Sequence, residues 1–215
     1  PTGATIDVAE RDALLDFARR HDLWVITDEV YDRIIYDTEH VSFLGAGYDK
    51  LLLVNSFSKT FAMTGWRIGY ILSPNIEAMD QIVKLQYYIS ACSNDAMQYA
   101  VLTAFNEAAD YPAEMTVEFK ARRDLICGRL NAMPGVTCHV PEGAFYVFPK
   151  VEVSGMNSEE IAIALLDGGV LCSPGTAFGC SGEGHLRFAY TVGREDITRG
   201  MDKVEAVLMR LRGQA

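Results

Sequence analysis

Apolar residues recur along this chain in two patterns, and their order predicts a fold that combines helices and strands. Several segments carry apolar residues three or four positions apart, as amphipathic helices do: 7–21, 74–89, 94–105, 112–133, 157–167 and 197–211. The runs at 23–27 and 51–54 are almost wholly apolar, which favours strands buried on both faces, and 67–72 is a third candidate strand. A helix that leads into such a strand is typical of a parallel α/β sheet.

Residues 112–215 predict a smaller α+β unit. Short strands are expected at 136–140, 143–149, 170–173 and 185–190, with helices at 157–167 and 197–211. A long helix precedes them, beginning at the Tyr111-Pro112 break and ending at Pro134-Gly135. We therefore expect two domains, 1–111 and 112–215, the second including the interdomain helix.

Capping residues indicate where the helices begin. Asp7 precedes Glu10, and Asn157 precedes Glu160, with the spacing of a capping box. Structural roles are expected for two pairs within helices. The pattern places Arg122-Arg123 on a solvated face and Tyr87-Tyr88 in the core or a subunit interface.

Charge and cysteine content narrow the choice of partners. The net charge is −10 and the pI about 4.8, which argues against nucleic acid and anionic membranes. The five cysteines form no C-x-x-C motif and indicate reduced thiols in a cytoplasmic protein. The four histidines lack metal-binding spacing, and no apolar run approaches the length of a membrane span.

The main concentration of reactive side chains lies in Ser56–Tyr70, between two predicted strands. This stretch places Ser56, Ser58, Lys59 and Arg67 in a polar loop at a strand end, where ligands bind in α/β proteins. An amine there can attack a carbonyl carbon, and an arginine with two hydroxyls can hold a phosphate. Taken alone, these residues also suit a solvated surface loop.

The order of residues in this stretch resembles that of a known family. Ser-x-Ser-Lys, followed by Gly-Trp-Arg-Ile-Gly-Tyr, is similar to the cofactor-lysine motif of class I/II aminotransferases. These are fold type I enzymes that use pyridoxal 5′-phosphate (PLP). The resemblance implies part of a fold type I large domain, mostly parallel sheet with flanking helices, and a C-terminal α+β small domain. It also implies that Lys59 binds PLP as a Schiff base and that Ser56, Ser58 and Arg67 bind its phosphate.

Two further candidates follow the strand predicted at 23–27. Asp28 alone is typical of a cap or turn. Within Asp28-Glu29-Val30-Tyr31, however, it is similar to the family's Asp-Glu-x-Tyr pattern upstream of the lysine. The resemblance implies that Asp28 pairs with the protonated pyridine nitrogen and that the Tyr31 hydroxyl reaches the phenolic oxygen. A carboxylate at that nitrogen keeps the ring protonated and electron-withdrawing.

Arg187 is the candidate substrate-binding residue. It lies between Leu186 and Phe188 in a predicted strand, where an unpaired guanidinium is costly to bury. A structural carboxylate could be its partner. The resemblance implies instead that Arg187 binds the substrate's α-carboxylate, because bidentate geometry favours arginine over lysine. The preceding Pro-Gly-x-x-Phe-Gly at 174–179 resembles the family's loop on the substrate side, and a structural turn is the alternative.

The implied reaction is the transfer of an amino group between an L-amino acid and a 2-oxo acid. The resemblance assigns catalytic roles to Lys59, Asp28 and Tyr31, with Lys59 moving the proton in a ping-pong reaction. Two alternatives stay open. One is a PLP-dependent lyase or synthase of the same fold, and the other is a non-catalytic aminotransferase-like effector domain of a transcription regulator.

Pro1-Thr2-Gly3 resembles the end of the family's Asn-Pro-x-Gly turn. We therefore expect this chain to be the C-terminal half of a longer protein that forms a homodimer in its full-length form. The resemblance implies that the sheet takes strands from both halves of the chain. The 215 residues alone should leave sheet edges and apolar surface uncovered and should be inactive. The side chain of the preferred amino acid is not indicated.

Overall fold

The computed structural model describes residues 1–213, and the chain divides into two compact units. One unit is Thr5–Thr116, and the other joins Pro1–Ala4 to the chain from Val117 onward. The division falls inside helix α5 (Tyr111–Asn131), and the predicted boundary at 111/112 lies at the start of the same helix. No helix of the described residues has both the length and the apolarity needed to cross a membrane.

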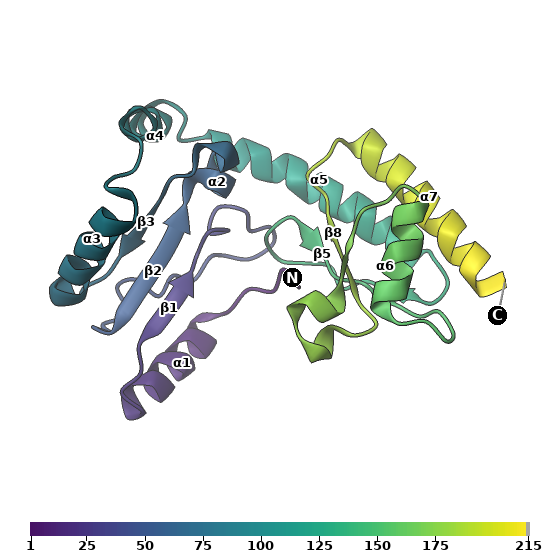
Figure 1. Cartoon of the computed structure of the whole chain (residues 1–215), viewed down its shortest axis with the longest axis horizontal. Helices are drawn as coiled ribbons and strands as arrows, with labels where there is room; N and C mark the ends of the chain where they lie inside the picture. The colour runs from purple at the N-terminus through teal and green to yellow at the C-terminus, as the bar shows by residue number, and fades with distance from the viewer. Residues whose placement is uncertain (214–215) are drawn as a thin grey trace. The chain divides into compact units, whose positions relative to one another are not determined.

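The first unit is built on a mixed three-stranded sheet in the order β1-β2-β3 (Figure 1). Strand β1 (Val25–Asp28) runs parallel to β2 (Leu51–Ser56), and the register sets Asp28 opposite Val54. Strand β3 (Gly69–Leu72) is antiparallel to β2 and sets Gly69 opposite Ser56. The three strands lie where the apolar runs predict them, with shifts of one or two residues.

Capped helices accompany this sheet, as the sequence predicts. Helix α1 (Val8–Arg20) has the predicted capping box between Asp7 and Glu10 and lies beside β1 in Figure 1. Helix α3 (Ile76–Ser90) lies beside β3 and is capped by Asn75, and α4 (Asp95–Glu107) is capped by Asn94. Each cap side chain accepts a backbone N–H that the first turn leaves unpaired.

Two apolar clusters hold the first unit together. The first joins α1 to β2 and the loop between β1 and β2, and its buried members are Leu15, Ala18, Phe43, Tyr48 and Leu51. The second joins the segment after β2 to α4, and its buried members are Phe57, Phe61, Ile68, Val101 and Ala104. The second cluster therefore fixes the stretch in which the candidate lysine lies.

A large apolar area of this unit is exposed. The prediction that 23–27 is buried on both faces is wrong for this chain, because Ile26 is 68% exposed in an edge strand. Tyr87 and Tyr88 are also exposed, so of their two predicted places the core of this chain is excluded, and a subunit interface stays a prediction. The expected uncovered sheet edge and apolar surface are confirmed.

The second unit combines α5 with short strands and two further helices. The strands are β4 (Val136–Thr137), β5 (Tyr146–Val147), β6 (Lys150–Val151), β7 (Ser173–Pro174) and β8 (Leu186–Ala189). All the pairings are antiparallel, in the orders β4-β6 and β5-β8-β7. Helix α6 (Ser158–Asp167) carries the predicted capping box of Asn157, and α7 (Arg194–Gly213) buries its predicted stripe, including Ile197 and Leu208.

One side chain accounts for the early end of strand β4. Strand β4 ends at Thr137, although the apolar pattern predicts a strand to residue 140. The Asn131 amide donates to the carbonyl of Cys138 at 2.9 Å and accepts its backbone N–H at 2.8 Å. Because both backbone groups of Cys138 are occupied, they are not available to a neighbouring strand.

Arg123 is buried, so its predicted place on a solvated face is wrong. The residue is only 4% exposed. Its Nη1 donates to the carbonyl of Pro141 at 3.1 Å, and its Nε donates to Asp124 at 2.9 Å. Arg122 is also bound, to Glu118 and to the carbonyl of Thr191.

Candidate active site

Asp28 and the segment that carries Lys59 lie at the same edge of the sheet. Asp28 is the last residue of β1, and Ser56 is the last residue of β2. Because these strands are parallel, their carboxyl ends meet at one edge, and the loops after them are neighbours. A hydrogen bond of 3.5 Å from Thr60 Oγ1 to Asp32 Oδ1 also joins the two loops.

The segment after β2 is a one-turn helix, α2 (Phe57–Thr60), and not the predicted loop. Ser56 is its N-cap, and the Ser56 Oγ accepts the backbone N–H of Ser58 at 3.0 Å. The ring centroids of Phe57 and Phe61 lie 6.4 Å apart, and both rings pack against Phe105 of α4. The two phenylalanines, four positions apart, were the available signal for a helical turn. Lys59 is held half-buried on this turn.

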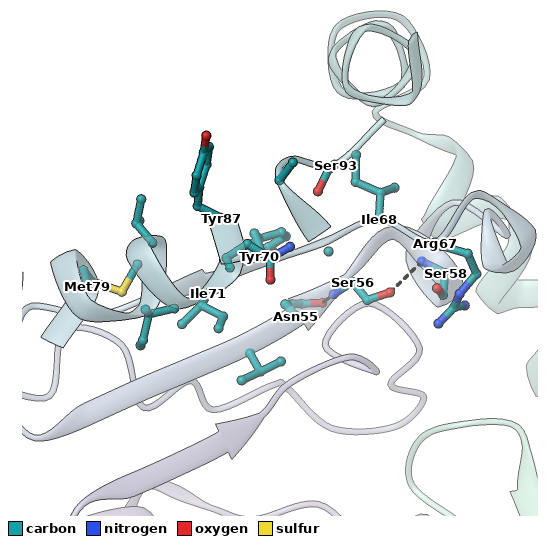
Figure 2. A pocket seen from close by; sticks show the side chains of 16 residues that line it. Asn55, Ser56, Ser58, Arg67, Ile68, Tyr70, Ile71, Met79, Tyr87 and Ser93 are labelled. Atoms are coloured by element: carbon teal, nitrogen blue, oxygen red, sulfur yellow. Dashed lines mark hydrogen bonds between the residues drawn. The ribbon is translucent and has the colours of Figure 1, made fainter. Parts of the chain in front are cut away.

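All three predicted phosphate-binding residues line a single cavity of about 630 Å³. Figure 2 shows Ser56, Ser58 and Arg67 together at one end of it. Arg67 is exposed and adopts a left-handed conformation with φ of 54° after the 3₁₀ turn Thr64–Trp66. Its Nη1 donates to the carbonyl of Thr64 at 2.8 Å. Two hydroxyls and a guanidinium are therefore collected at one place.

Asp28, Tyr31 and Lys59 do not line that cavity. Asp28 is exposed, and its Oδ1 accepts the backbone N–H of Val30 at 3.2 Å. Tyr31 is half-buried three residues later. The predicted cofactor-binding residues thus lie at one sheet edge in two groups. The predicted phosphate-binding residues line the cavity. Asp28 and Tyr31 lie at and just after the end of β1, and Lys59 lies on α2.

Glu29 holds this edge together, a role that sequence reasoning missed. It is 7% exposed, and its carboxylate accepts the backbone N–H of Phe43 at 3.0 Å. The same carboxylate bonds His40 Nε2 at 2.7 Å and the Thr27 hydroxyl at 3.3 Å. Because Glu29 directly follows Asp28 in the chain, these bonds also fix the end of β1. No local pattern marks His40 as the partner, because eleven positions separate it from Glu29.

Opposite charges stabilise the contact between Glu29 and His40, which we call the Glu29–His40 anchor. Burial opposes ionisation of Glu29, but the hydrogen bonds from His40 and Phe43 outweigh it and lower the pKa of the carboxyl from its usual 4.5. The hydrogen bond to Glu29 in turn raises the pKa of His40 from its usual 6.5. The two groups therefore form an ion pair between pH 4.5 and 6.5, next to Asp28 in the chain.

Arg187 lies in the second unit, in the middle of β8. Its guanidinium carbon lies over the rings of Tyr146 and Phe178, at 4.4 and 4.6 Å from their centroids. Its Nη2 also lies 3.5 Å from the Ser173 hydroxyl. Among the described residues of this unit, no carboxylate forms an ion pair with Arg187, so the structural carboxylate considered from the sequence is not found there. The aromatic faces orient the guanidinium instead.

The loop before β8 depends on two glycines. It consists of two 3₁₀ turns, Gly175–Phe178 and Cys180–Gly182. A Cβ at Gly175 would lie 1.9 Å from the carbonyl oxygen of Gly182, and a Cβ at Gly182 would lie 2.0 Å from that of Gly175. Only residues without a side chain allow this approach of the two backbones, which places Phe178 against Arg187.

Comparison with known proteins decides the family. The model of "Aminotransferase class I and II" matches residues 1–204. The chain belongs to the class I and II aminotransferase family.

Relatives of this aminotransferase chain agree with the assignment. It is 40% identical over 214 residues to an aspartate aminotransferase of Pyrococcus abyssi, covering 97% of this chain and 54% of the relative. It is 36% identical to an aromatic-amino-acid aminotransferase of Thermococcus litoralis, with the same coverage. The chain thus spans about half the length of the curated relatives it matches.

Solved structures confirm the predicted fold class, a partial fold type I large domain followed by an α+β unit. The aromatic aminotransferase of Pyrococcus horikoshii matches with a TM-score of 0.91 and 38% identity, over 98% of this chain and 57% of that one. An aspartate aminotransferase of Thermus thermophilus with maleate matches with a TM-score of 0.89 and 32% identity, over 96% of this chain and 54% of that one.

Proposed function

We propose that the full-length protein is a PLP-dependent aminotransferase that moves an amino group between an L-amino acid and a 2-oxo acid. The observation that supports this most directly is the sheet edge itself. It carries the carboxylate of Asp28 at the end of β1 and the amine of Lys59 on the turn after the adjacent parallel strand β2. Membership of the family supports the same reaction.

The residues present fit PLP by the chemistry of their donors. The protein carries a net charge of −10, so a phosphate needs local donors, and Ser56, Ser58 and Arg67 supply them at one end of a cavity. Among the described residues, no group of three or more His, Cys, Asp or Glu could hold a metal ion. When bound, PLP supplies a carbonyl carbon for amines and a ring that withdraws electrons from the substrate's Cα.

Each residue then has a distinct role. Lys59 Nζ would hold PLP covalently, and its amine would take the proton from the substrate's Cα. Asp28 would keep the ring nitrogen protonated, and the Tyr31 hydroxyl would donate a hydrogen bond to the cofactor. Arg187, oriented by Tyr146 and Phe178, binds the α-carboxylate of the substrate.

Acidic and aromatic L-amino acids are the first substrates to test. The named relatives include aspartate and aromatic-amino-acid aminotransferases, and one solved relative is described with maleate, a dicarboxylate. A 2-oxo acid such as 2-oxoglutarate is the proposed acceptor. Turnover in both directions with ping-pong kinetics is the expected behaviour.

The decisive experiment replaces Lys59 in the full-length protein loaded with PLP. Wild-type protein should show a visible absorption band and transfer amino groups, and Lys59→Ala should lose both. Lys50→Ala is the matched control, because Lys50 pairs with Asp22 at the opposite end of β2 and should change neither. A Lys59→Ala protein with an unchanged spectrum would exclude the assignment. PLP binding without any turnover in wild-type protein would favour the effector-domain alternative.

A second experiment separates the substrate role of Arg187 from a structural one. Arg187→Ala should raise KM for amino acids strongly while the PLP absorbance persists. Arg199→Ala, which removes a surface pair with Asp196, serves as the control and should leave KM unchanged. An unchanged KM in Arg187→Ala would assign the arginine to packing alone.

We further propose a cytoplasmic homodimer for the full-length protein. All five cysteines are free thiols, which suits a reducing compartment. The exposed apolar residues of α3, including Ile76, Tyr88 and Ile89, supply surface that another segment or subunit can cover. Light scattering of the full-length protein would measure its mass, and a monomer would contradict the dimer.

A further inference from the structure

Two buried thiols face each other in the second unit, and neither belongs to the proposed active site. Cys127 lies on α5, and Cys138 directly follows β4. Their sulfur atoms are 4.0 Å apart, and Cys138 donates to Cys127. The residues are 3% and 5% exposed. Cys92 and Cys180, by contrast, are exposed.

The surrounding residues fix this pair. The Asn131 side chain bonds both backbone groups of Cys138, at 2.9 and 2.8 Å, and so holds it against the end of α5. Arg123 lies one helical turn before Cys127 and is itself buried. Its positive charge favours a thiolate at Cys127. The two sulfurs are therefore kept in contact by hydrogen bonds that do not involve them.

We propose that Cys127 and Cys138 are a redox-active dithiol that a hydroperoxide converts to an intramolecular disulfide. The Cys127 thiolate attacks the terminal peroxide oxygen, so that an S–O bond forms, the O–O bond breaks, and a sulfenic acid is produced with release of an alkoxide, or of hydroxide from hydrogen peroxide. The sulfur of Cys138 then attacks the sulfenic sulfur, so that the S–S bond forms, the S–O bond breaks, and the sulfenic hydroxyl leaves with the thiol proton as water. With hydrogen peroxide, two thiols and one peroxide give one disulfide and two waters.

The geometry and the acidities of the two thiols agree with this order. The hydrogen bond from Cys138 lowers the pKa of Cys127 and outweighs burial, which raises it, while the charges of Arg123 and Asp124 act in opposite directions. The same hydrogen bond and burial raise the pKa of Cys138. Cys127 accepts the hydrogen bond from Cys138 and lies one helical turn after Arg123, so it takes the role of the attacking thiolate in this proposal, and Cys138 resolves the sulfenic acid. The sulfurs must approach by about 2 Å to reach the length of a disulfide bond.

The disulfide would join α5 to the segment after β4 and close the loop between them. A cross-link of this kind restricts the unfolded chain and stabilises the folded unit. Burial should make the reaction slower than oxidation of an exposed thiol, because the peroxide must enter. Proximity should still direct the product to one cross-link rather than to mixed disulfides.

Peptide mapping of the full-length protein tests this. After treatment with hydrogen peroxide, alkylation of remaining thiols and trypsin digestion without reductant, residues 124–129 and 130–150 each form a peptide with one cysteine. The expected product is these two peptides joined, with a mass lower than their sum by two hydrogen atoms. It should disappear on reduction and in Cys127→Ser and Cys138→Ser, but persist in the matched controls Cys172→Ser and Cys180→Ser.

Wild-type protein alone can overturn the proposal, whether or not the variants fold. The proposal is wrong if both peptides are recovered in alkylated form under conditions in which the Cys180 thiol is oxidised. It is also wrong if Cys127 is converted to a sulfinic acid without any cross-link. None of these outcomes depends on PLP binding or on amino transfer, so failure here leaves the proposed function untouched.

Discussion

Replacement of Glu29 by glutamine should weaken the first unit in a way that depends on pH. Glutamine keeps an oxygen that can accept the backbone N–H of Phe43, now 3.0 Å from the Glu29 carboxylate. It cannot form the ion pair with His40, whose Nε2 lies 2.7 Å away. The variant therefore removes a charge-assisted hydrogen bond within a nearly buried site and leaves the shape almost unchanged.

The expected loss is about 1.5–3 kcal/mol of the free energy of unfolding, the usual contribution of a hydrogen bond to a charged group. Its pH dependence follows from the two pKa shifts. The pKa of Glu29 is lowered, so its contribution is present above 4.5 and is lost as the pH falls through the folded value. The pKa of His40 is raised, so its contribution is present below 6.5 and is lost as the pH rises through the folded value.

The pair is therefore fully stabilising between pH 4.5 and 6.5, the usual values of its two groups. Denaturant unfolding of the full-length protein at about pH 6 and at about pH 9 would measure the difference between wild type and Glu29→Gln. The gap should be large at the lower pH and shrink at the higher one. Glu39→Gln, at an exposed position beside His40, is the control and should show little effect. An equal gap at both pH values would refute the ion pair.

Two further variants test features of the second unit. Gly175→Ala should destabilise the unit by about 1–3 kcal/mol or more, because the new Cβ meets the carbonyl of Gly182, and thermal unfolding would show it. An unchanged Tm would mean that the loop has room that the structure does not show. Arg123→Ala leaves the carbonyl of Pro141 without its donor and should cost about 1–3 kcal/mol in denaturant unfolding, more than Arg122→Ala. Equal costs would show that burial of Arg123 contributes nothing.

The sequence predicts the helices of this chain better than its short strands. Local signals define the helices, such as the capping boxes of Asp7 and Asn157. The strand predicted at 136–140 stops early because the Asn131 side chain occupies the backbone of Cys138, a contact that apolar pattern does not encode. The prediction that Ile26 is buried is wrong for a different reason. The pattern describes a covered strand, whereas this chain leaves β1 at an edge.

In the candidate site, too, features encoded by neighbouring residues are predicted, and contacts between residues far apart in the chain are not. The stretch around Lys59 and the residues after β1 are recognisable from their order, and the structure sets them at one sheet edge. The helical turn at Phe57 and the anchor between Glu29 and His40 depend on contacts with partners elsewhere in the chain. Such partners cannot be chosen from one sequence, because many residues of suitable type compete for each position.

The left-handed backbone at Arg67 lowers folding stability at a residue that we propose binds the cofactor phosphate. A residue with a Cβ loses about 1–2 kcal/mol by adopting this conformation, whereas glycine adopts it without strain. Folding stability alone would therefore favour glycine at this position, whereas the proposed phosphate contact needs the guanidinium. Arg67→Gly should accordingly raise Tm and weaken the binding of the proposed phosphate group.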